Sequence, residues 1–304
     1  MKLKAWVNAA RLRTLPLSIS GIIVGYALAS LYGFNNSTIF ILALLTTVAL
    51  QVTSNFANDY GDGVKGTDND DRIGPKRALQ SGILTRKELK KGIIVAIVLC
   101  LLLIAGLIFT AFTAFTADSI IYIALFFILG FCAVWASIKY TVGKSAYGYR
   151  GLGDVFVFIF FGLVSVLGAM FLLTKTLFTM AFLPAITIGL LSVAVLNLNN
   201  LRDIISDKNS GKNTIVVKMG FLNGKKYHYS ILITSFISVL IFTIYNYTNV
   251  LNFMWLLAYI PIAKHFIKVL KMKDSLTMDP ELKVVALSSF LFAILFYFSF
   301  NNFL

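Results

Sequence analysis

The sequence predicts an all-α, polytopic membrane protein with nine transmembrane helices. Its 304 residues are 58% hydrophobic and only 13% charged, whereas roughly 45–50% apolar residues are already normal for a soluble domain. The apolar residues gather in runs long enough to cross a hydrocarbon core. An outer-membrane barrel would instead show alternating segments of about ten residues. We therefore expect a single transmembrane domain that covers residues 1–304.

Nine apolar runs approach the length of about 20 residues that a membrane-spanning helix needs. They cover residues 15–32, 38–57, 92–113, 119–138, 153–173, 179–200, 229–246, 251–270 and 283–300. Cys100 and Cys132 lie inside these runs, so we expect both to be small buried apolar side chains. His228 and His265 stand apart at loop edges, and we expect neither to bind a metal.

The distribution of basic residues predicts the orientation in the membrane. Almost all Lys and Arg residues fall in the N-terminal tail and in the loops near 58–91, 139–152, 201–228 and 264–282. The opposite loops contain a single basic residue, Lys175. The positive-inside rule therefore places the N-terminus in the cytoplasm, and an odd number of spans places the C-terminus outside.

The net charge of +14 is explained by these loops. Such charge is typical of topology signals and of contact with anionic lipid head groups. We expect no nucleic-acid partner, because the sequence has no soluble basic domain that could bind one. Nothing in the sequence indicates an obligatory protein partner.

Two clusters of acidic and amide side chains stand at the cytoplasmic ends of apolar runs. Asn55, Asp59 and Asp62 follow one another at i, i+4 and i+7, which places them on one face of a helix. We expect Asn199, Asp203 and Asp207, at the end of the sixth run, to repeat this geometry on a single helical stripe. A single cluster could be a set of solvated helix-end residues, but two matched clusters on one side of the membrane indicate a function. Carboxylate and amide oxygens suit Mg²⁺, which usually leaves positions for substrate phosphates.

Basic side chains interleave with these acids. They are Lys65, Arg72, Lys76 and Arg77 after the first cluster and Arg202, Lys208 and Lys212 in the second. A site for a bare cation would exclude them, whereas a diphosphate bridged by Mg²⁺ offers phosphate oxygens that Arg and Lys bind. The sequence has no Walker-type glycine loop, so ATP hydrolysis is not indicated.

A third polar tract lies just before the fifth apolar run. It contains Tyr140, Tyr147, Tyr149, Arg150 and Asp154. Aromatic faces stabilise nearby cations, and a Tyr hydroxyl or an Arg can orient an anionic aromatic substrate. An aromatic belt at the membrane interface is the alternative interpretation of these tyrosines.

Together the motifs resemble those of the intramembrane aromatic prenyltransferases. They look most like those of the 1,4-dihydroxy-2-naphthoate polyprenyltransferases of menaquinone synthesis. The resemblance rests on Asn55-Phe-Ala-Asn58-Asp59-Tyr60-Gly-Asp62, on Asn199-Asn200-Leu-Arg202-Asp203-Ile-Ile-Ser-Asp207, and on Gly211-Lys212-Asn-Thr214. Arg11-Leu-Arg13-Thr14-Leu15-Pro16 and Tyr149-Arg150-Gly151-Leu-Gly153-Asp154 fit the N-terminal and middle signatures, so the resemblance covers about residues 6–220.

The resemblance implies nine helices around a central cavity with a cytoplasmic mouth, and it implies the site residues. Mg²⁺ would be held by Asp59, Asp62, Asp203 and Asp207. Substrates would contact Asn55, Asn58, Lys65, Arg72, Arg77, Tyr149, Arg150, Asn199, Arg202 and Lys212. The sequence departs from the wider superfamily at Gly66, where a third acid is often found, so Asp62 or Asp68 could complete the first metal set. It also reads Tyr140-Thr-Val-Gly143-Lys144 where a Gly-Gly-Pro turn is expected.

The activity implied by the resemblance is Mg²⁺-dependent transfer of a polyprenyl group from polyprenyl diphosphate to dihydroxynaphthoate, with loss of CO₂, giving demethylmenaquinol. The location implied is the bacterial cytoplasmic membrane. Transfer to 4-hydroxybenzoate is the alternative within enzymes, because the same metal site would serve it. An ion or anion transporter is disfavoured, since transporters place ionisable groups or broken helices near the midplane and here the acids stand at span ends.

Overall fold

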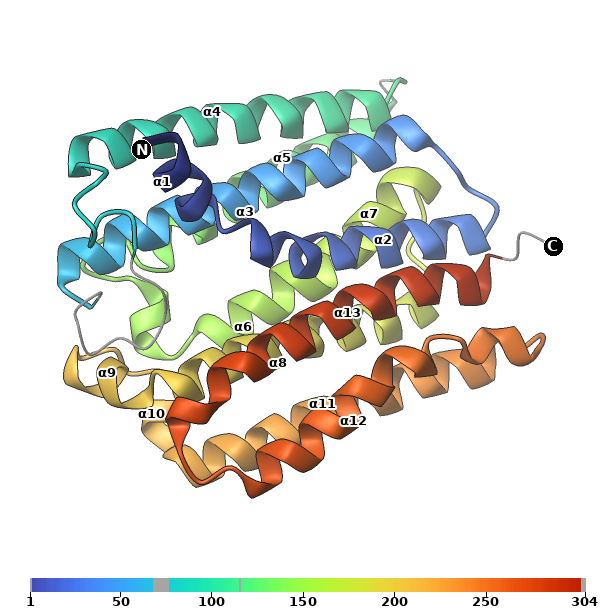
Figure 1. The fold of residues 1–304 in the computed structure, drawn as a ribbon. Helices are drawn as coiled ribbons and strands as arrows, with labels where there is room; N and C mark the ends of the chain where they lie inside the picture. Colours follow the sequence, from blue (N-terminus) through green and yellow to red (C-terminus); the bar gives the residue numbers. More distant parts are fainter. Residues whose placement is uncertain (1, 68–76, 115, 302–304) are drawn as a thin grey trace. The chain divides into compact units, whose positions relative to one another are not determined.

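Apolar helices dominate the computed structural model, which describes residues 2–67, 77–114 and 116–301 (Figure 1). Nine helical stretches within these ranges are long and apolar enough to cross a membrane. They are Lys2–Leu31, Ser37–Lys65, Arg86–Ala111, Ala117–Lys139, Gly153–Thr174, Thr179–Arg202, Phe221–Tyr245, Val250–Lys271 and Asp279–Phe300. The all-α class and the nine predicted spans are therefore confirmed for the described part of the chain.

The chain divides into two compact units, and each is described by itself. The first unit comprises Met1–Leu15, Ile41–Gly153 and Ile205–Thr214. Its elements are α1 (Lys2–Ala10), η1 (Leu12–Thr14), most of α3 (Ser37–Lys65), α4 (Arg86–Ala111), α5 (Ala117–Lys139), η2 (Tyr147–Arg150) and nearly all of α9 (Ile204–Asn209).

The second unit comprises Pro16–Phe40, Asp154–Ile204 and Ile215–Leu304. Its elements in the first part of the chain are nearly all of α2 (Leu15–Leu31), then α6 (Gly153–Val157), η3 (Phe158–Val164), α7 (Ser165–Thr174), η4 (Thr179–Ala181) and α8 (Phe182–Arg202). They are followed by α10 (Ile215–Met219), α11 (Phe221–Tyr245), η5 (Val250–Phe253), α12 (Leu256–Lys271), η6 (Ser275–Met278) and α13 (Asp279–Phe300).

Helix α3 of the first unit extends two turns beyond the apolar run that predicts it, as far as Lys65. The added turns carry Asp59 and Asp62, which are both buried. Gly61 lies between these acids, and a Cβ atom at this position would come within 2.8 Å of the backbone carbon of Thr141. A glycine is therefore needed here, because it lets the Thr141 segment contact the acidic end of the helix.

Helices α4 and α5 of the first unit lie side by side (Figure 1). Both carry exposed apolar side chains. Thr85 and Glu88 form a capping box that starts α4. Only 11% of the most apolar window of α5 is buried, and exposed side chains such as Ile121, Phe131 and Trp135 cover the rest. Lipid is the solvent that matches such a helix.

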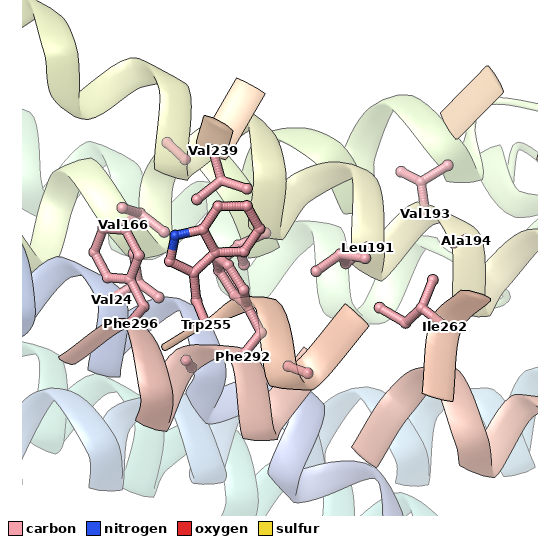
Figure 2. Packing of buried hydrophobic residues seen from close by; sticks show 14 of the residues in the cluster. Val24, Val166, Leu191, Val193, Ala194, Val239, Trp255, Ile262, Phe292 and Phe296 are labelled. Atoms are coloured by element: carbon pink, nitrogen blue, oxygen red, sulfur yellow. The ribbon is translucent and has the colours of Figure 1, made fainter. Parts of the chain in front are cut away.

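Buried aliphatic and aromatic side chains together fill the core of the second unit (Figure 2). Trp255 is fully buried and meets Phe292 edge to face, with ring centroids 6.2 Å apart. Its indole N–H donates a hydrogen bond to the Thr243 hydroxyl at 2.9 Å. The one polar atom of this large side chain is thus satisfied, as burial requires.

Two glycines allow a close helix crossing in the second unit. Segment η3 is π-helical over Phe158–Val164 and packs on α8. A Cβ atom on Gly162 would lie 2.6 Å from the Cα of Gly189 and 2.8 Å from the carbonyl oxygen of Ala185. Small residues of this kind let backbones approach within a membrane, where packing rather than hydrophobicity drives association.

The prediction that His228 and His265 stand apart is wrong. Their Nε2 atoms lie 2.9 Å apart, between α11 and α12. The Nδ1 atom of His265 is 2.7 Å from a carboxylate oxygen of Glu281 on α13, and Lys268 forms an ion pair with the same carboxylate at 2.6 Å. Helical packing brings the two rings together over a separation of 37 residues, which no local spacing reveals.

The two cysteines differ in their surroundings. Cys100 is fully buried on α4, where its sulfur lies 3.3 Å from the Thr53 hydroxyl, as expected for a small buried side chain. Cys132 on α5 is exposed, so its predicted burial is wrong. The reason is that α5 buries little of its surface, and an apolar residue on it faces outward by default.

Candidate functional site

Asp59 lies at the centre of an ion-pair cluster in the first unit. Its Oδ1 atom accepts hydrogen bonds from Arg11 at 2.7 Å and from Arg77 at 3.1 Å. Its Oδ2 atom accepts one from the backbone N–H of Ala78 at 3.3 Å. Charge-assisted bonds of this kind are stronger than neutral ones and fix the carboxylate in position.

Asp62 lies one turn further along α3 and contacts Tyr149. The Tyr149 hydroxyl donates to Asp62 at 2.8 Å and lies 2.6 Å from the Thr67 hydroxyl. Lys65 stands over the Tyr149 ring, 3.7 Å from its centroid. Burial first, and then the charge of Asp62, raise the pKa of Tyr149 above its ordinary value. Tyr149 therefore keeps its proton at physiological pH and remains a hydrogen-bond donor.

Lys212 interacts with one acid from each acidic cluster, Asp62 and Asp207, within the first unit. Its ammonium group is 3.3 Å from Asp207, and both partners are buried. Burial lowers the pKa of Lys212, but attraction to Asp207 and Asp62 outweighs it, so the net shift is upward. The backbone N–H of Asn213 donates to the Tyr149 carbonyl at 3.1 Å, which fastens this segment beside η2. One acid of each sequence cluster thus acts on the same cation.

The two asparagines of the first cluster serve neighbouring loops in this structure. The Asn55 amide donates to the carbonyl oxygen of Ala10 at 2.8 Å and lies 3.3 Å from the Thr14 hydroxyl. The Asn58 oxygen accepts from the Thr141 hydroxyl at 3.2 Å. Asn55 and Asp59, one turn apart on α3, therefore hold the same N-terminal loop, as the helical spacing allows.

The second cluster begins in the second unit, where Arg202 gathers acceptors around itself. It donates two bonds to Asp203, at 2.8 and 2.6 Å, one to Asn199 at 2.7 Å and one to Asp279. Arg202 is only 3% exposed. Arg202 therefore contacts both Asn199 and Asp203, the two other predicted site residues of this unit.

The single helical stripe predicted for the second cluster is wrong. Helix α8 ends at Arg202, and Asp203 takes φ −93° and ψ 11° before α9 starts at Ile204. This bridge region of backbone space is sparsely populated, and many active-site residues occupy it. The register between Asn199 and Asp207 is therefore not that of a continuous helix.

Arg150 and Asp154 complete the middle tract. Arg150 is exposed at the end of η2 in the first unit. Asp154 belongs to the second unit, where it is buried and interacts electrostatically with Tyr227. Asp68 and Arg72, both predicted to be site residues, lie outside the described residues.

The donor chemistry of the first unit fits a magnesium ion that is shared with a phosphate. Asp62 and Asp207 are buried carboxylates near a common point, marked by Lys212. Across 2–67, 77–114 and 116–301, no group of three or more His, Cys, Asp or Glu side chains is arranged to hold a metal. Mg²⁺ usually binds through one or two carboxylates and takes its other ligands from substrate phosphates and water.

Sequence reasoning did not assign Arg11 or Thr67 to the site. Arg11 contacts Asp59 across 48 positions of sequence, and Thr67 contacts Tyr149 across 82. The N-terminal signature Arg11-Leu-Arg13 is the one signal for Arg11, and it does not indicate which residue Arg11 contacts. The second had no signal, because a lone threonine after a helix end is common.

Comparison with known proteins finds relatives over most of this chain. The sequence model of the UbiA prenyltransferase family matches residues 18–295. A 1,4-dihydroxy-2-naphthoate octaprenyltransferase from Escherichia coli (strain K12) is 42% identical over 293 residues, covering 96% of this chain and 94% of the relative. The enzyme of the same name from Haemophilus influenzae is 42% identical over 298 residues, covering 97% and 95%.

Solved structures share the fold at much lower sequence identity. An apo UbiA homologue from Aeropyrum pernix K1 matches with a TM-score of 0.67 at 13% identity, covering 92% of this chain and 98% of that one. A UbiA homologue from Archaeoglobus fulgidus bound to GPP and Mg²⁺ matches with a TM-score of 0.64 at 15% identity, covering 96% and 99%. With a sequence match over most of its length and the same fold, this chain belongs to the UbiA prenyltransferase family.

Proposed function

We propose that this membrane protein transfers a polyprenyl group from polyprenyl diphosphate to 1,4-dihydroxy-2-naphthoate, with loss of CO₂, to give demethylmenaquinol. The observation that carries the proposal is the 42% identity, over 96% of the chain, with an enzyme named for this acceptor. The Archaeoglobus homologue of the same fold binds a prenyl diphosphate together with Mg²⁺, which supports the donor and the metal. We further propose that the whole chain acts as one domain with a cavity that opens to the cytoplasm.

The proposed metal ligands are the acids of the two clusters, with one alternative left open. They are Asp59, Asp62, Asp203 and Asp207, and Asp68 is the alternative to Asp62. Substrate contacts are assigned to Asn55, Asn58, Lys65, Arg72, Arg77, Tyr149, Arg150, Asn199, Arg202 and Lys212. The hydrogen bond from Tyr149 to Asp62, the ion pair of Lys212 with Asp207 and the attraction of Lys212 to Asp62 support this assignment within the first unit.

The chain's own residues bind, orient and protect the reactants. Bound Mg²⁺ supplies charge neutralisation that makes diphosphate a better leaving group. We assign to Lys212 and Arg77 the binding of phosphate oxygens as the allylic carbon–oxygen bond breaks and its electron pair leaves with diphosphate. Tyr149 keeps its proton and donates a hydrogen bond to the Asp62 carboxylate. Apolar helix surroundings exclude water, which would quench the allylic cation.

The acceptor ring completes the reaction. Its carboxyl-bearing carbon forms the new carbon–carbon bond with the allylic cation, and the carbon–carboxylate bond then breaks. The electrons of that bond return to the ring and restore aromaticity, and CO₂ leaves. Arg150 is exposed beside η2 and is the residue we propose for the acceptor carboxylate.

A competition assay tests the reaction class and the acceptor together. Membranes containing the protein receive a polyprenyl diphosphate with dihydroxynaphthoate and 4-hydroxybenzoate in equal amounts, and mass spectrometry identifies the products. We expect the decarboxylated naphthol product alone, its formation abolished by a chelator and restored by Mg²⁺. A prenylated hydroxybenzoate as the main product would contradict the acceptor, and turnover in excess chelator would contradict the metal.

The orientation is also a proposal, supported by the distribution of basic residues. We place the protein in the bacterial cytoplasmic membrane with its N-terminus and site on the cytoplasmic side and its C-terminus outside. A cysteine at Lys144, in a basic loop, should react with an impermeant maleimide only in inside-out vesicles. A cysteine at Asn35, in a loop without basic residues, should react only in intact cells. Both positions are exposed, so the reverse pattern would overturn the orientation.

A further inference from the structure

The carboxylate of Asp59 is already occupied by donors of the chain itself. Arg11 and Arg77 share its Oδ1 atom, and the backbone of Ala78 takes Oδ2. Asp59 is only 1% exposed, so these partners leave little room for solvent. A proposed metal ligand therefore rests in a closed ion-pair cluster.

The loop that carries Arg11 is built to present this side chain. Arg11 takes a left-handed conformation, with φ 50° and ψ 55°, between α1 and η1. That conformation costs a non-glycine residue about 1 kcal/mol or more. The strained turn is fixed by Thr14, whose N–H and hydroxyl both donate to the Arg11 carbonyl, and by Asn55, which donates to the Ala10 carbonyl. The turn thus directs the Arg11 guanidinium toward Asp59, although the left-handed conformation is unfavourable for a non-glycine residue.

Occupation of Asp59 decides what this cluster can admit. Arg11 and Arg77 both bind the Oδ1 atom, so a free divalent cation must displace a guanidinium group to reach it. A prenyl diphosphate that carries one Mg²⁺ is still an anion, and it offers phosphate oxygens that match a guanidinium fork. The cluster therefore discriminates between a metal alone and a metal with its diphosphate.

We infer that Arg11 is an exchangeable counterion, which holds Asp59 while no donor is bound and moves to the diphosphate when the metal–diphosphate complex arrives. This inference rests on the proposed function, and it adds an order of binding: metal enters with the diphosphate rather than ahead of it. Arg77 already belongs to the proposed diphosphate contacts, whereas Arg11 lies outside every set assigned above. Arg11 thus pairs with the proposed metal ligand Asp59 before the donor binds and contacts the diphosphate afterwards.

Manganese binding without any diphosphate tests this role directly. Mn²⁺ suits the same oxygen ligands as Mg²⁺, and electron paramagnetic resonance reports its free concentration over the purified full-length protein. Arg11→Gln and Arg11→Met should each bind Mn²⁺ about tenfold or more tightly than the wild type, because one opposing charge is removed. Arg11→Lys keeps the charge and should stay within about twofold of the wild type.

Arg13→Gln is the matched control, since it removes the same charge from an exposed residue two positions away. It should bind Mn²⁺ within about twofold of the wild type. The gain of Arg11→Gln should vanish in the double variant with Asp59→Asn, as a double-mutant cycle requires if the two residues interact. The inference is overturned if Arg11→Gln binds no more tightly than Arg13→Gln, or if its gain survives in the double variant. Neither result would affect chelator-sensitive prenyl transfer, because the competition assay tests the proposed function separately.

Discussion

Asp203→Asn should lose prenyl transfer by about a thousandfold or more while the protein remains folded. The substitution removes one charge from the proposed metal set, and such a set supplies several kcal/mol of transition-state stabilisation. Arg202 keeps Asp279 and Asn199 as partners after the change, so no buried cation is left alone. Turnover of product per folded protein, with melting followed by circular dichroism, measures both effects.

Asp59→Asn should lose turnover to the same extent and also lose stability. Arg11 and Arg77 both donate to this carboxylate, and breaking a buried ion pair typically costs about 3–5 kcal/mol. Asp118→Asn is the matched control for both variants, because Asp118 is exposed in the first turn of α5. It should match the wild type in rate and melting. Wild-type turnover in Asp59→Asn or Asp203→Asn would exclude that residue from the metal site.

Gly162→Ala should destabilise the second unit by about 1–3 kcal/mol or more, as overpacking in a closed core does. The added methyl group would lie 2.6 Å from the Cα of Gly189 and 2.8 Å from the Ala185 carbonyl oxygen. Both are backbone atoms, so η3 and α8 must separate to admit it. Melting in detergent, followed by circular dichroism, measures the loss.

Gly106→Ala is the control for this prediction. Gly106 lies within α4, and a Cβ atom placed there meets no atom within 4 Å. Alanine should therefore leave stability unchanged or raise it by about 0.5–1 kcal/mol through its better helix propensity. Equal melting temperatures for the two alanine variants would show that the crossing of η3 and α8 does not need its glycine.

The sequence predicted the spans well because membrane thickness sets the length of an apolar run. Helix α2 covers Leu15–Leu31 where residues 15–32 were expected, and α8 ends two residues beyond the sixth run. The acids of the first cluster also share one helix, as their spacing indicated. Length and periodicity are local quantities, and local quantities can be read from one sequence.

The parts that failed depend on backbone changes without a sequence signal or on distant contacts. Phe158–Val164 is apolar throughout, so nothing in it distinguishes a π-helical stretch from an α-helical one. Arg11 adopts a left-handed turn that would ordinarily indicate glycine. The break at Asp203 follows a polar sequence that fits a helix equally well. The pairing of Arg11 with Asp59 depends on how segments 48 residues apart pack.

The histidine pair of the last three helices has a consequence for how this chain can change. Glu281, already paired with Lys268, can only accept, so the Nδ1 atom of a neutral His265 donates to it. The Nε2 atom of His265 must then accept from His228. A substitution at any one of these positions leaves a buried neighbour with the wrong donor or acceptor. We therefore expect His228, His265 and Glu281 to be replaced together rather than one at a time. They lie in the last third of the sequence, which carries no catalytic motif.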